Sequence, residues 1–278
     1  MGFGCNAAGV VGCRIIDSKR ERLIAMLTNA LVPCNGRFPT LIALISMFML
    51  SSEGVIGSVG AALILSGFII LSVLVTILCS KILSVSFLKG EPSSFVLELP
   101  PYRTPQFGRV IVRSVLDRTL FVLGRSVAFA APAGGALWLL ANITVVDKSI
   151  LVHVSEFLEP FGTMLGMDGA ILLAFVLALP ANEIFLPILL MIYNSGHALT
   201  EYSGYAELFS VLNNNGWTLV TAVCVILFTM FHFPCATTVM TVKKESGKSR
   251  YAVAAVVLPT LVGIILCLFV NLFFIIFY

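Results

Sequence analysis

Two stretches of this sequence decide the fold: Val32-Pro33-Cys34-Asn35-Gly36 and Phe233-Pro234-Cys235-Ala236-Thr237. Each places a proline-cysteine pair inside an apolar segment of membrane-spanning length. Proline ends or kinks a helix because it lacks the backbone N–H and clashes with the preceding turn. In lipid, the backbone groups that such a break frees are tolerated only inside protein or beside a water-filled cavity. The two pairs therefore predict broken helices with a polar site at the interruption.

The composition is that of an integral membrane protein. Of the 278 residues, 59% are hydrophobic and 11% are charged, whereas about a quarter of a soluble domain is charged. A helix needs roughly 20 apolar residues to cross a bilayer core. Four stretches without Asp, Glu, Lys or Arg reach that length, namely 54–80, 126–146, 208–242 and 251–278. The seven cysteines are odd in number and lie mostly in apolar segments, which argues against a disulfide framework.

The distribution of Lys and Arg orients the chain, because basic loops stay on the cytoplasmic side. Basic clusters lie in 14–22, 81–118 and 243–250, whereas the connections 147–159 and 195–207 are acidic. We expect the basic regions to be cytoplasmic and the acidic ones to be external. The segment 168–194 must then start and finish outside, and a proline near its middle predicts a re-entrant hairpin.

These assignments predict an all-α integral membrane protein, an inverted repeat of re-entrant hairpin, broken helix and full transmembrane helix. Residues 1–81 would form the C-terminal part of the first repeat and 119–278 the second. Residues 82–118 would form a cytoplasmic linker, with either an amphipathic interfacial helix from 105 to 118 or an ordinary connector. The first repeat starts at its hairpin tip, so we expect an N-terminal portion to be missing or supplied by another polypeptide.

Seven residues near the predicted breaks could bind a metal ion: Cys5, Asn6, Cys34, Asn182, Glu183, His232 and Cys235. Thiolate, amide and imidazole groups suit a first-row ion such as Fe(II), and thiolate selects against Mg²⁺ and Ca²⁺. An acid at membrane depth is costly, so Glu183 is a functional candidate. The structural alternatives are buried cysteines, asparagines that cap half-helices, a histidine that satisfies a carbonyl, and a hydrated glutamate.

Nucleotide binding finds no support in the sequence. The run Ser246-Gly247-Lys248-Ser249 resembles the end of a phosphate-binding loop, but Val242 stands where that motif requires glycine. We therefore read the run as a solvated cytoplasmic loop.

Three regions resemble the ferrous iron transport protein B family. The runs Gly2-Phe3-Gly4-Cys5-Asn6 and Cys34-Asn35-Gly36-Arg37 are similar to its first gate region, 98–103 to its cytoplasmic linker, and 232–238 to its second gate region. The resemblance implies Fe(II) import across a prokaryotic cytoplasmic membrane, with Cys5, Cys34 and Cys235 matching the gate cysteines. The family's GTP-binding domain is absent from this chain, so we expect no enzymatic activity. Asn6-Ala7-Ala8 departs from the family's frequent Asn-Val-Pro.

The sequence thus predicts the permease portion of an Fe(II) importer, a multi-pass protein of the prokaryotic inner membrane. Ferrous iron would be its substrate, with no permanently bound cofactor. Expected partners are the lipid bilayer, a separate polypeptide with the G domain and N-terminal membrane helices, and a small cytoplasmic iron-transport accessory protein. A homo-oligomer is left open, and no nucleic acid is expected. The alternatives are a transporter of nucleosides or other small solutes, and a non-transporting fragment that needs a partner chain.

Overall fold

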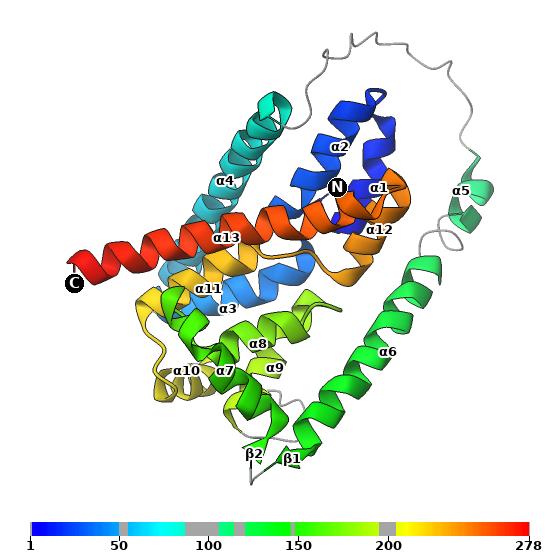
Figure 1. Cartoon of the computed structure of the whole chain (residues 1–278). Helices are drawn as coiled ribbons and strands as arrows, with labels where there is room; N and C mark the ends of the chain where they lie inside the picture. Colours follow the sequence, from blue (N-terminus) through cyan, green and yellow to red (C-terminus); the bar gives the residue numbers. More distant parts are fainter. Residues whose placement is uncertain are drawn as a thin grey trace.

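The computed structural model describes residues 2–49, 55–86, 106–113, 120–145, 148–194 and 204–277. Across these ranges the chain is helical, apart from one antiparallel ladder that joins two strands of two residues each (Figure 1). The prediction of an all-α fold is therefore confirmed.

The first half of the chain contains the first predicted break. Its elements are α1 (Asn6–Gly12), the 3-10 helix η1 (Cys13–Ile15), α2 (Lys19–Thr28), η2 (Asn29–Leu31), η3 (Asn35–Arg37), α3 (Phe38–Phe48) and α4 (Val55–Ser86). The Ser18 hydroxyl caps α2 by accepting a hydrogen bond from the Glu21 backbone N–H. The helical path stops at Leu31 and resumes at Asn35, on either side of Pro33.

One described helix, α5 (Phe107–Arg113), lies in the region 82–118 predicted to link the halves, and α6 (Phe121–Asn142) follows it at the start of the predicted second repeat. The helix predicted over 105–118 is confirmed for 107–113, whereas 114–119 lie outside the described residues. The position of α5 at the membrane surface stays a prediction.

The second half contains the second predicted break. Its elements are β1 (Thr144–Val145), β2 (Lys148–Ser149), α7 (Ile150–Met164), α8 (Gly169–Leu177), η5 (Asn182–Ile184), α9 (Phe185–Tyr193), α10 (Tyr205–Asn214), α11 (Leu219–Phe231), α12 (Ala236–Ser246) and α13 (Ser249–Phe277). The element order from α9 to α13 parallels the order from α1 to α4. The inverted relation between the halves and the domain boundaries stay predictions.

Four helical stretches are long and apolar enough to cross a membrane: Lys19–Phe48, Gly57–Ser86, Leu219–Ser246 and Ser249–Ile276. The pair α7 and α8, which bend by 108° at their junction, would make a fifth. The sequence also predicts that 119–143 crosses. That segment corresponds to α6, which contains Arg125 and Pro132 and is not among the four.

The predicted hairpin over 168–194 is present. The helix α8 packs against α9, and the turn between them contains Pro180. A helix of nine residues is about 14 Å long, which is roughly half of a bilayer core. The hairpin therefore has the length expected of a re-entrant element, although its depth in the membrane stays a prediction.

The second broken helix forms the centre of the structure. Over the most apolar 18 residues of the α11–α12 stretch, 67% of the residues are buried. The corresponding share for α4 is 6%. The aromatic ring of Phe175 on α8 stacks on Phe185 of α9 with ring centroids 4.1 Å apart, and Phe228 of α11 meets it edge-on. Helix α4 lies at one side of the molecule and α6 at the opposite side (Figure 1). The exposed surface of α4 is apolar, as expected of a lipid-facing helix.

Candidate functional site

Each predicted gate cysteine occupies the position immediately before a helical segment. Cys5 precedes α1, Cys34 precedes η3, and Cys235 precedes α12, and none of the three side chains caps its helix. Ala181 holds the same position before η5. The first N–H groups of a helix carry partial positive charge and favour a negatively charged group. The interruptions are therefore confirmed where the proline-cysteine pairs predict them.

Within each half, one hydrogen bond ties the hairpin tip to the helix break. The backbone N–H of Asn35 donates to the Gly4 carbonyl over 3.3 Å. The backbone N–H of Ala236 donates to the Leu179 carbonyl over 2.9 Å. In both cases the donor follows a gate cysteine and the acceptor lies just before a tip, so the two halves use the same contact.

The first break also meets the second hairpin tip. The side-chain nitrogen Nδ2 of Asn182 lies 3.9 Å from Cys34 Sγ. The other side-chain atom of Asn182, Oδ1, is buried without a hydrogen-bond partner among the described residues. Glu183 is exposed, and its carboxylate lies against Gly36, where a Cβ would stand 3.0 Å from Glu183 Oε1. A thiol, an unpartnered amide oxygen and a carboxylate thus lie around one break.

A buried arginine joins the two broken helices, and the sequence analysis overlooked it. Arg37 is completely buried, and its guanidinium donates to the carbonyls of Ala30, Met230, His232 and Phe233. The Ala30 carbonyl lies near the end of the first half-helix. The other three carbonyls lie at or just beyond the C-terminal end of α11. Helix C-termini favour cations, so these carbonyls stabilise the charge.

The lone position of Arg37 in the sequence could have revealed it. It is the one charged residue between Arg22 and Glu53. The argument that singled out Glu183, that a charge at membrane depth is costly, applies equally to this arginine.

His232 lies in an environment that favours its structural alternative. Its Nδ1 is 3.0 Å from the carbonyl oxygens of both Phe228 and Thr229. The imidazole is buried among aromatic rings, with the Phe175 and Phe233 centroids 5.1 and 5.0 Å away. These contacts account for the histidine without a metal ion.

Three predicted ligands remain, namely Cys5, Asn6 and Cys235. Cys5 is exposed, and Cys235 Sγ is 3.3 Å from the Thr238 hydroxyl. Asn6 is 3% exposed, and both of its amide atoms lack hydrogen-bond partners among the described residues. In the part of the chain that the structure describes, no three His, Cys, Asp or Glu side chains lie close enough to hold one ion.

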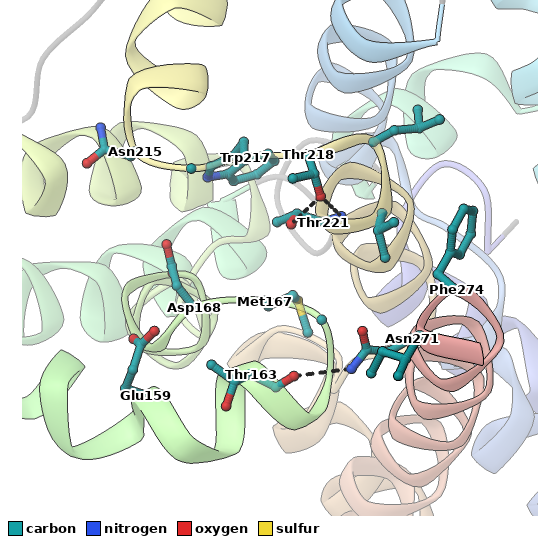
Figure 2. A pocket seen from close by; sticks show the side chains of 15 residues that line it. Glu159, Thr163, Met167, Asp168, Asn215, Trp217, Thr218, Thr221, Asn271 and Phe274 are labelled. Atoms are coloured by element: carbon teal, nitrogen blue, oxygen red, sulfur yellow. Dashed lines mark hydrogen bonds between the residues drawn. The ribbon is translucent and has the colours of Figure 1, made fainter. Parts of the chain in front are cut away.

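A cavity of about 810 Å³ opens beside the start of α8, and two carboxylates face it (Figure 2). The Asp168 carboxylate accepts hydrogen bonds from the Ile171 N–H and the Tyr193 hydroxyl. Glu159 accepts one from the Gly169 N–H over 2.7 Å. Burial raises the pKa of the Asp168 carboxyl, and these hydrogen bonds oppose the rise. Both acids therefore stabilise the first turn of α8.

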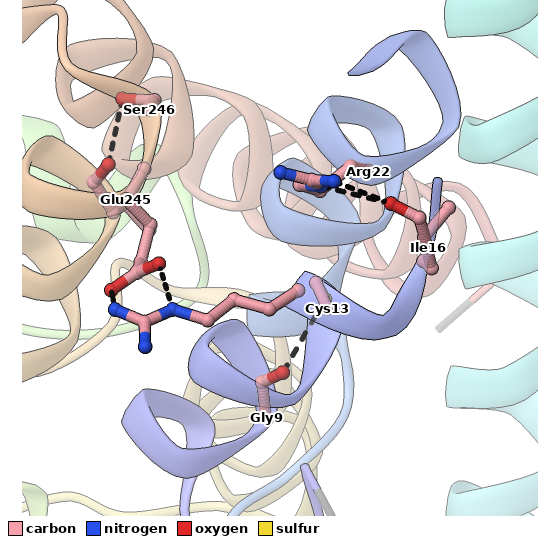
Figure 3. A network of polar contacts seen from close by, with 8 residues as sticks. Gly9, Cys13, Ile16, Arg22, Glu245 and Ser246 are labelled. Atoms are coloured by element: carbon pink, nitrogen blue, oxygen red, sulfur yellow. Dashed lines mark hydrogen bonds and ion pairs between the residues drawn. The ribbon is translucent and has the colours of Figure 1, made fainter. Parts of the chain in front are cut away.

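A polar network joins the first hairpin arm to α12 at the basic end of the molecule (Figure 3). The Arg14 guanidinium donates to both carboxylate oxygens of Glu245, over 2.6 and 2.7 Å. Arg22 donates to the Ile16 carbonyl, which closes the loop between η1 and α2. The first hairpin arm is thus attached to an element of the second half.

Family comparisons agree with this architecture. Residues 65–117 match the family model "Ferrous iron transport protein B C terminus", and residues 120–249 match the Gate model, described as "Nucleoside recognition". No solved structure matches the chain.

Curated relatives cover nearly the whole chain. An "Fe(2+) transporter FeoB" of Staphylococcus aureus (strain MSSA476) is 25% identical over 276 residues, 96% of this chain and 38% of the relative. One of Leptospira interrogans is 26% identical over 87% of this chain and 38% of its own length. A Porphyromonas gingivalis relative, "Fe(2+) transport protein A/Fe(2+) transporter FeoB fusion protein", is 23% identical over 92% and 35%.

The chain thus spans somewhat more than a third of the length of these relatives. The two family-model matches follow one another along the chain, over 65–117 and 120–249. Together with the apolar helices, these matches identify a multi-pass protein of the prokaryotic cell membrane. Over nearly its whole length, the chain is similar to the C-terminal membrane portion of proteins of the ferrous iron transport protein B family.

Proposed function

We propose that this chain is the permease portion of a prokaryotic Fe(II) importer and carries ferrous iron into the cytoplasm. The observation that carries the proposal is the meeting of the first break with the second hairpin tip, where Cys34, Asn182 and Glu183 lie together. The names of the curated relatives, all Fe(2+) transporters, support the choice of substrate.

The donor groups at this break fit a borderline divalent ion. The Cys34 thiolate favours first-row metals over Mg²⁺ and Ca²⁺, while the Asn182 amide and the Glu183 carboxylate add oxygen ligands, the carboxylate with a negative charge. The unpartnered Oδ1 of Asn182 is a buried acceptor that a cation could satisfy. We assign Cys34, Asn182 and Glu183 as the primary ligands, with Cys235 approaching from the second break. Cys5 and Asn6 would act at the first hairpin tip, and His232 would position the break.

A transported ion must leave its site as readily as it enters. Arg37 lies within electrostatic range of both Cys34 and Cys235. Its fixed positive charge would balance negative charge on the two sulfur atoms when iron is absent. The same charge would weaken the binding of the cation when iron is present. A site that binds its ion weakly needs fewer protein ligands than a permanent metal centre. We therefore propose Fe(II) as a transported substrate and no bound cofactor.

The proposed partners follow from the relatives. The fusion of "Fe(2+) transport protein A" to the Porphyromonas relative supports a small cytoplasmic accessory protein. Since the chain spans 38% of the Staphylococcus relative, we propose a second polypeptide that supplies a G domain and further membrane helices. GTP hydrolysis would reside there, and this chain would have no enzymatic activity. Neither a homo-oligomer nor nucleic acid enters the proposal.

A second candidate function is transport of nucleosides or other small solutes. It is favoured by one observation, the match of residues 120–249 to the model described as "Nucleoside recognition". Such a substrate would need hydrogen-bonding side chains at the two helix breaks and the two hairpin tips. Three of these four positions carry cysteine instead. We therefore rank it below iron.

The test is uptake of radiolabelled solutes into proteoliposomes under reducing conditions. One set contains the chain alone, and a second contains the chain with a polypeptide that supplies the remaining length of the relatives. We expect saturable Fe(II) uptake, in one or both sets, that uridine does not inhibit. Uptake of labelled uridine without Fe(II) uptake would support the second candidate, and uptake of neither would support a non-transporting fragment.

A further inference from the structure

A second cavity lies between α2 and α4, at the basic end of the molecule. Its volume is about 580 Å³, and its lining includes Glu21, Asn29 and Val32 from the first broken helix and Thr76, Ser80 and Ser84 from α4. Its lining also includes Lys81, at the start of the basic region 81–118 that is predicted to be cytoplasmic.

The α4 side of this cavity is a row of hydroxyl groups. Ser72, Thr76, Ser80 and Ser84 recur every fourth residue, which places them along one ridge of the helix. The opposite surface of α4 is apolar, and Leu78 there is 57% exposed. A helix in contact with lipid alone has no need of such a row, because hydroxyl groups gain nothing from a hydrocarbon environment.

The hydroxyl groups that line the cavity have partners on both helices. Ser80 donates to the Thr28 hydroxyl over 3.3 Å, and Ser84 accepts from Arg20. Thr76 donates to the Ser72 carbonyl within α4, and Ser72 itself is completely buried and lies outside the lining. Bonds between hydroxyls of neighbouring helices also occur in ordinary packing, but close packing leaves no cavity of this size.

The cavity reaches from the basic end to the first break. Glu21 and Val32, which both line it, are eleven positions apart, or roughly 16 Å along a helix. Val32 stands two residues before Cys34. Asn29, also in the lining, donates through Nδ2 to the Asn6 carbonyl at the first hairpin tip. The cavity lining therefore extends from the basic region to within two positions of Cys34 in the sequence, although Cys34 itself is not part of the lining.

We propose that this cavity is a water-filled vestibule through which a hydrated divalent cation passes between the Cys34 break and the cytoplasm. The inference rests on the proposed function for its cargo, although its water content can be tested independently. Hydroxyl and amide oxygens replace part of the hydration shell of a divalent ion. The mouth carries both Glu21 and Lys81, so it holds charges of both signs.

The first test is cysteine accessibility, with modification measured residue by residue by mass spectrometry. Ser80→Cys and Leu78→Cys form a matched pair on α4, two residues apart, one in the cavity and one on the apolar surface. We expect a charged, membrane-impermeant thiol reagent to modify Ser80→Cys at least tenfold faster than Leu78→Cys. The reagent should act from the side on which Ser249→Cys reacts. Equal or absent modification at both positions, while Ser249→Cys reacts, would overturn the proposal.

The second test asks whether the cavity lies on the transport path. The side chain at position 80 is enlarged, and Fe(II) uptake by Ser80→Trp is compared with uptake by Leu78→Trp, with the native cysteines left in place in both variants. We expect Ser80→Trp alone to lose uptake at least tenfold, because only its indole would fill the cavity. Uptake by folded, inserted Ser80→Trp equal to that by Leu78→Trp would show that iron takes another route. If the wild type and Leu78→Trp carry no iron, the proposed function fails, whereas the accessibility result still decides whether the cavity holds water.

Discussion

Arg37 donates a hydrogen bond of 2.7 Å to the carbonyl of Met230, which lies 193 positions further along the chain. This contact makes the guanidinium a connection between the two broken helices. Each buried carbonyl that loses its donor costs about 1–3 kcal/mol. We predict that Arg37→Ala lowers the free energy of unfolding by roughly 3 kcal/mol or more, as measured by thermal unfolding in detergent.

The matched control is Arg14→Ala. The Arg14 side chain is exposed, and water screens its ion pair with Glu245, so its loss should change stability little. Arg37→Lys keeps the charge but loses the planar fork of donors, so it should be intermediate. Equal stability of the Arg37→Ala and Arg14→Ala variants would contradict the role assigned to the buried guanidinium.

The second prediction concerns the cysteines. Replacing Cys34 or Cys235 by serine should reduce Fe(II) uptake at least tenfold, because the hydroxyl keeps the size but loses the soft thiolate. Cys79→Ser and Cys267→Ser serve as controls, since both thiols lie in helices away from the breaks. Similar small losses at all four positions would rule out the site as proposed.

The third prediction concerns Glu183, whose carboxylate lies against Gly36 at the first break. Glu183→Gln keeps the shape and removes the charge, so uptake should fall at least tenfold while the protein remains folded and inserted. Glu207→Gln, on exposed α10, is the matched control and should retain wild-type uptake. Unchanged uptake in Glu183→Gln would leave the cysteines and the amide as the sole ligands.

The fourth prediction concerns orientation. In a background without the native cysteines, Ser203→Cys should react with an impermeant thiol reagent added to intact cells, and Ser249→Cys should react only after permeabilisation. Ser203 lies outside the described residues, so this prediction depends on the charge of its loop. The reverse labelling pattern would invert the topology and place the hydroxyl-lined cavity outside.

The fifth prediction is a pH dependence at Asp168, whose pKa burial raises. Because the folded state holds this proton more tightly than the unfolded chain, the carboxyl favours folding below about pH 4. That contribution is lost as the pH rises through the folded-state pKa. Asp168→Asn stays uncharged, so its unfolding temperature should vary less between about pH 4 and 7 than that of the wild type. A wild-type slope in the variant would exclude this carboxyl as the cause.

The helix breaks could be predicted from the sequence because their cause is local. Proline acts on its own turn, and the helical path stops at Pro33 and Pro234, whereas Pro132, Pro160 and Pro259 are accommodated inside continuous helices. The hairpin over 168–194 was predictable for the same reason, together with the charge of the flanking loops. Family resemblance then added the substrate, which neither spacing nor composition specifies.

Contacts between distant segments could not be predicted in this way. The approach of Asn182 to Cys34 joins residues 148 positions apart, and nothing near either residue specifies the other. The aromatic surroundings of His232 likewise depend on how α8 packs against α11. Arg37 differs, because a single charge in a long apolar stretch is visible in the sequence. Its importance follows from the high cost of a charge at membrane depth, as it does for Glu183.

The Arg14–Glu245 pair has a consequence for how the protein is made. Its two residues are 231 positions apart, and a ribosome adds about 5–20 residues per second. The first hairpin arm must therefore wait roughly 10–50 s for α12 to be synthesised. During that interval α1 and the polar groups around Asn6 lack their final neighbour at the membrane. Biogenesis of this protein thus requires that the first hairpin arm stay protected, by lipid, translocon or chaperone, until α12 has been inserted.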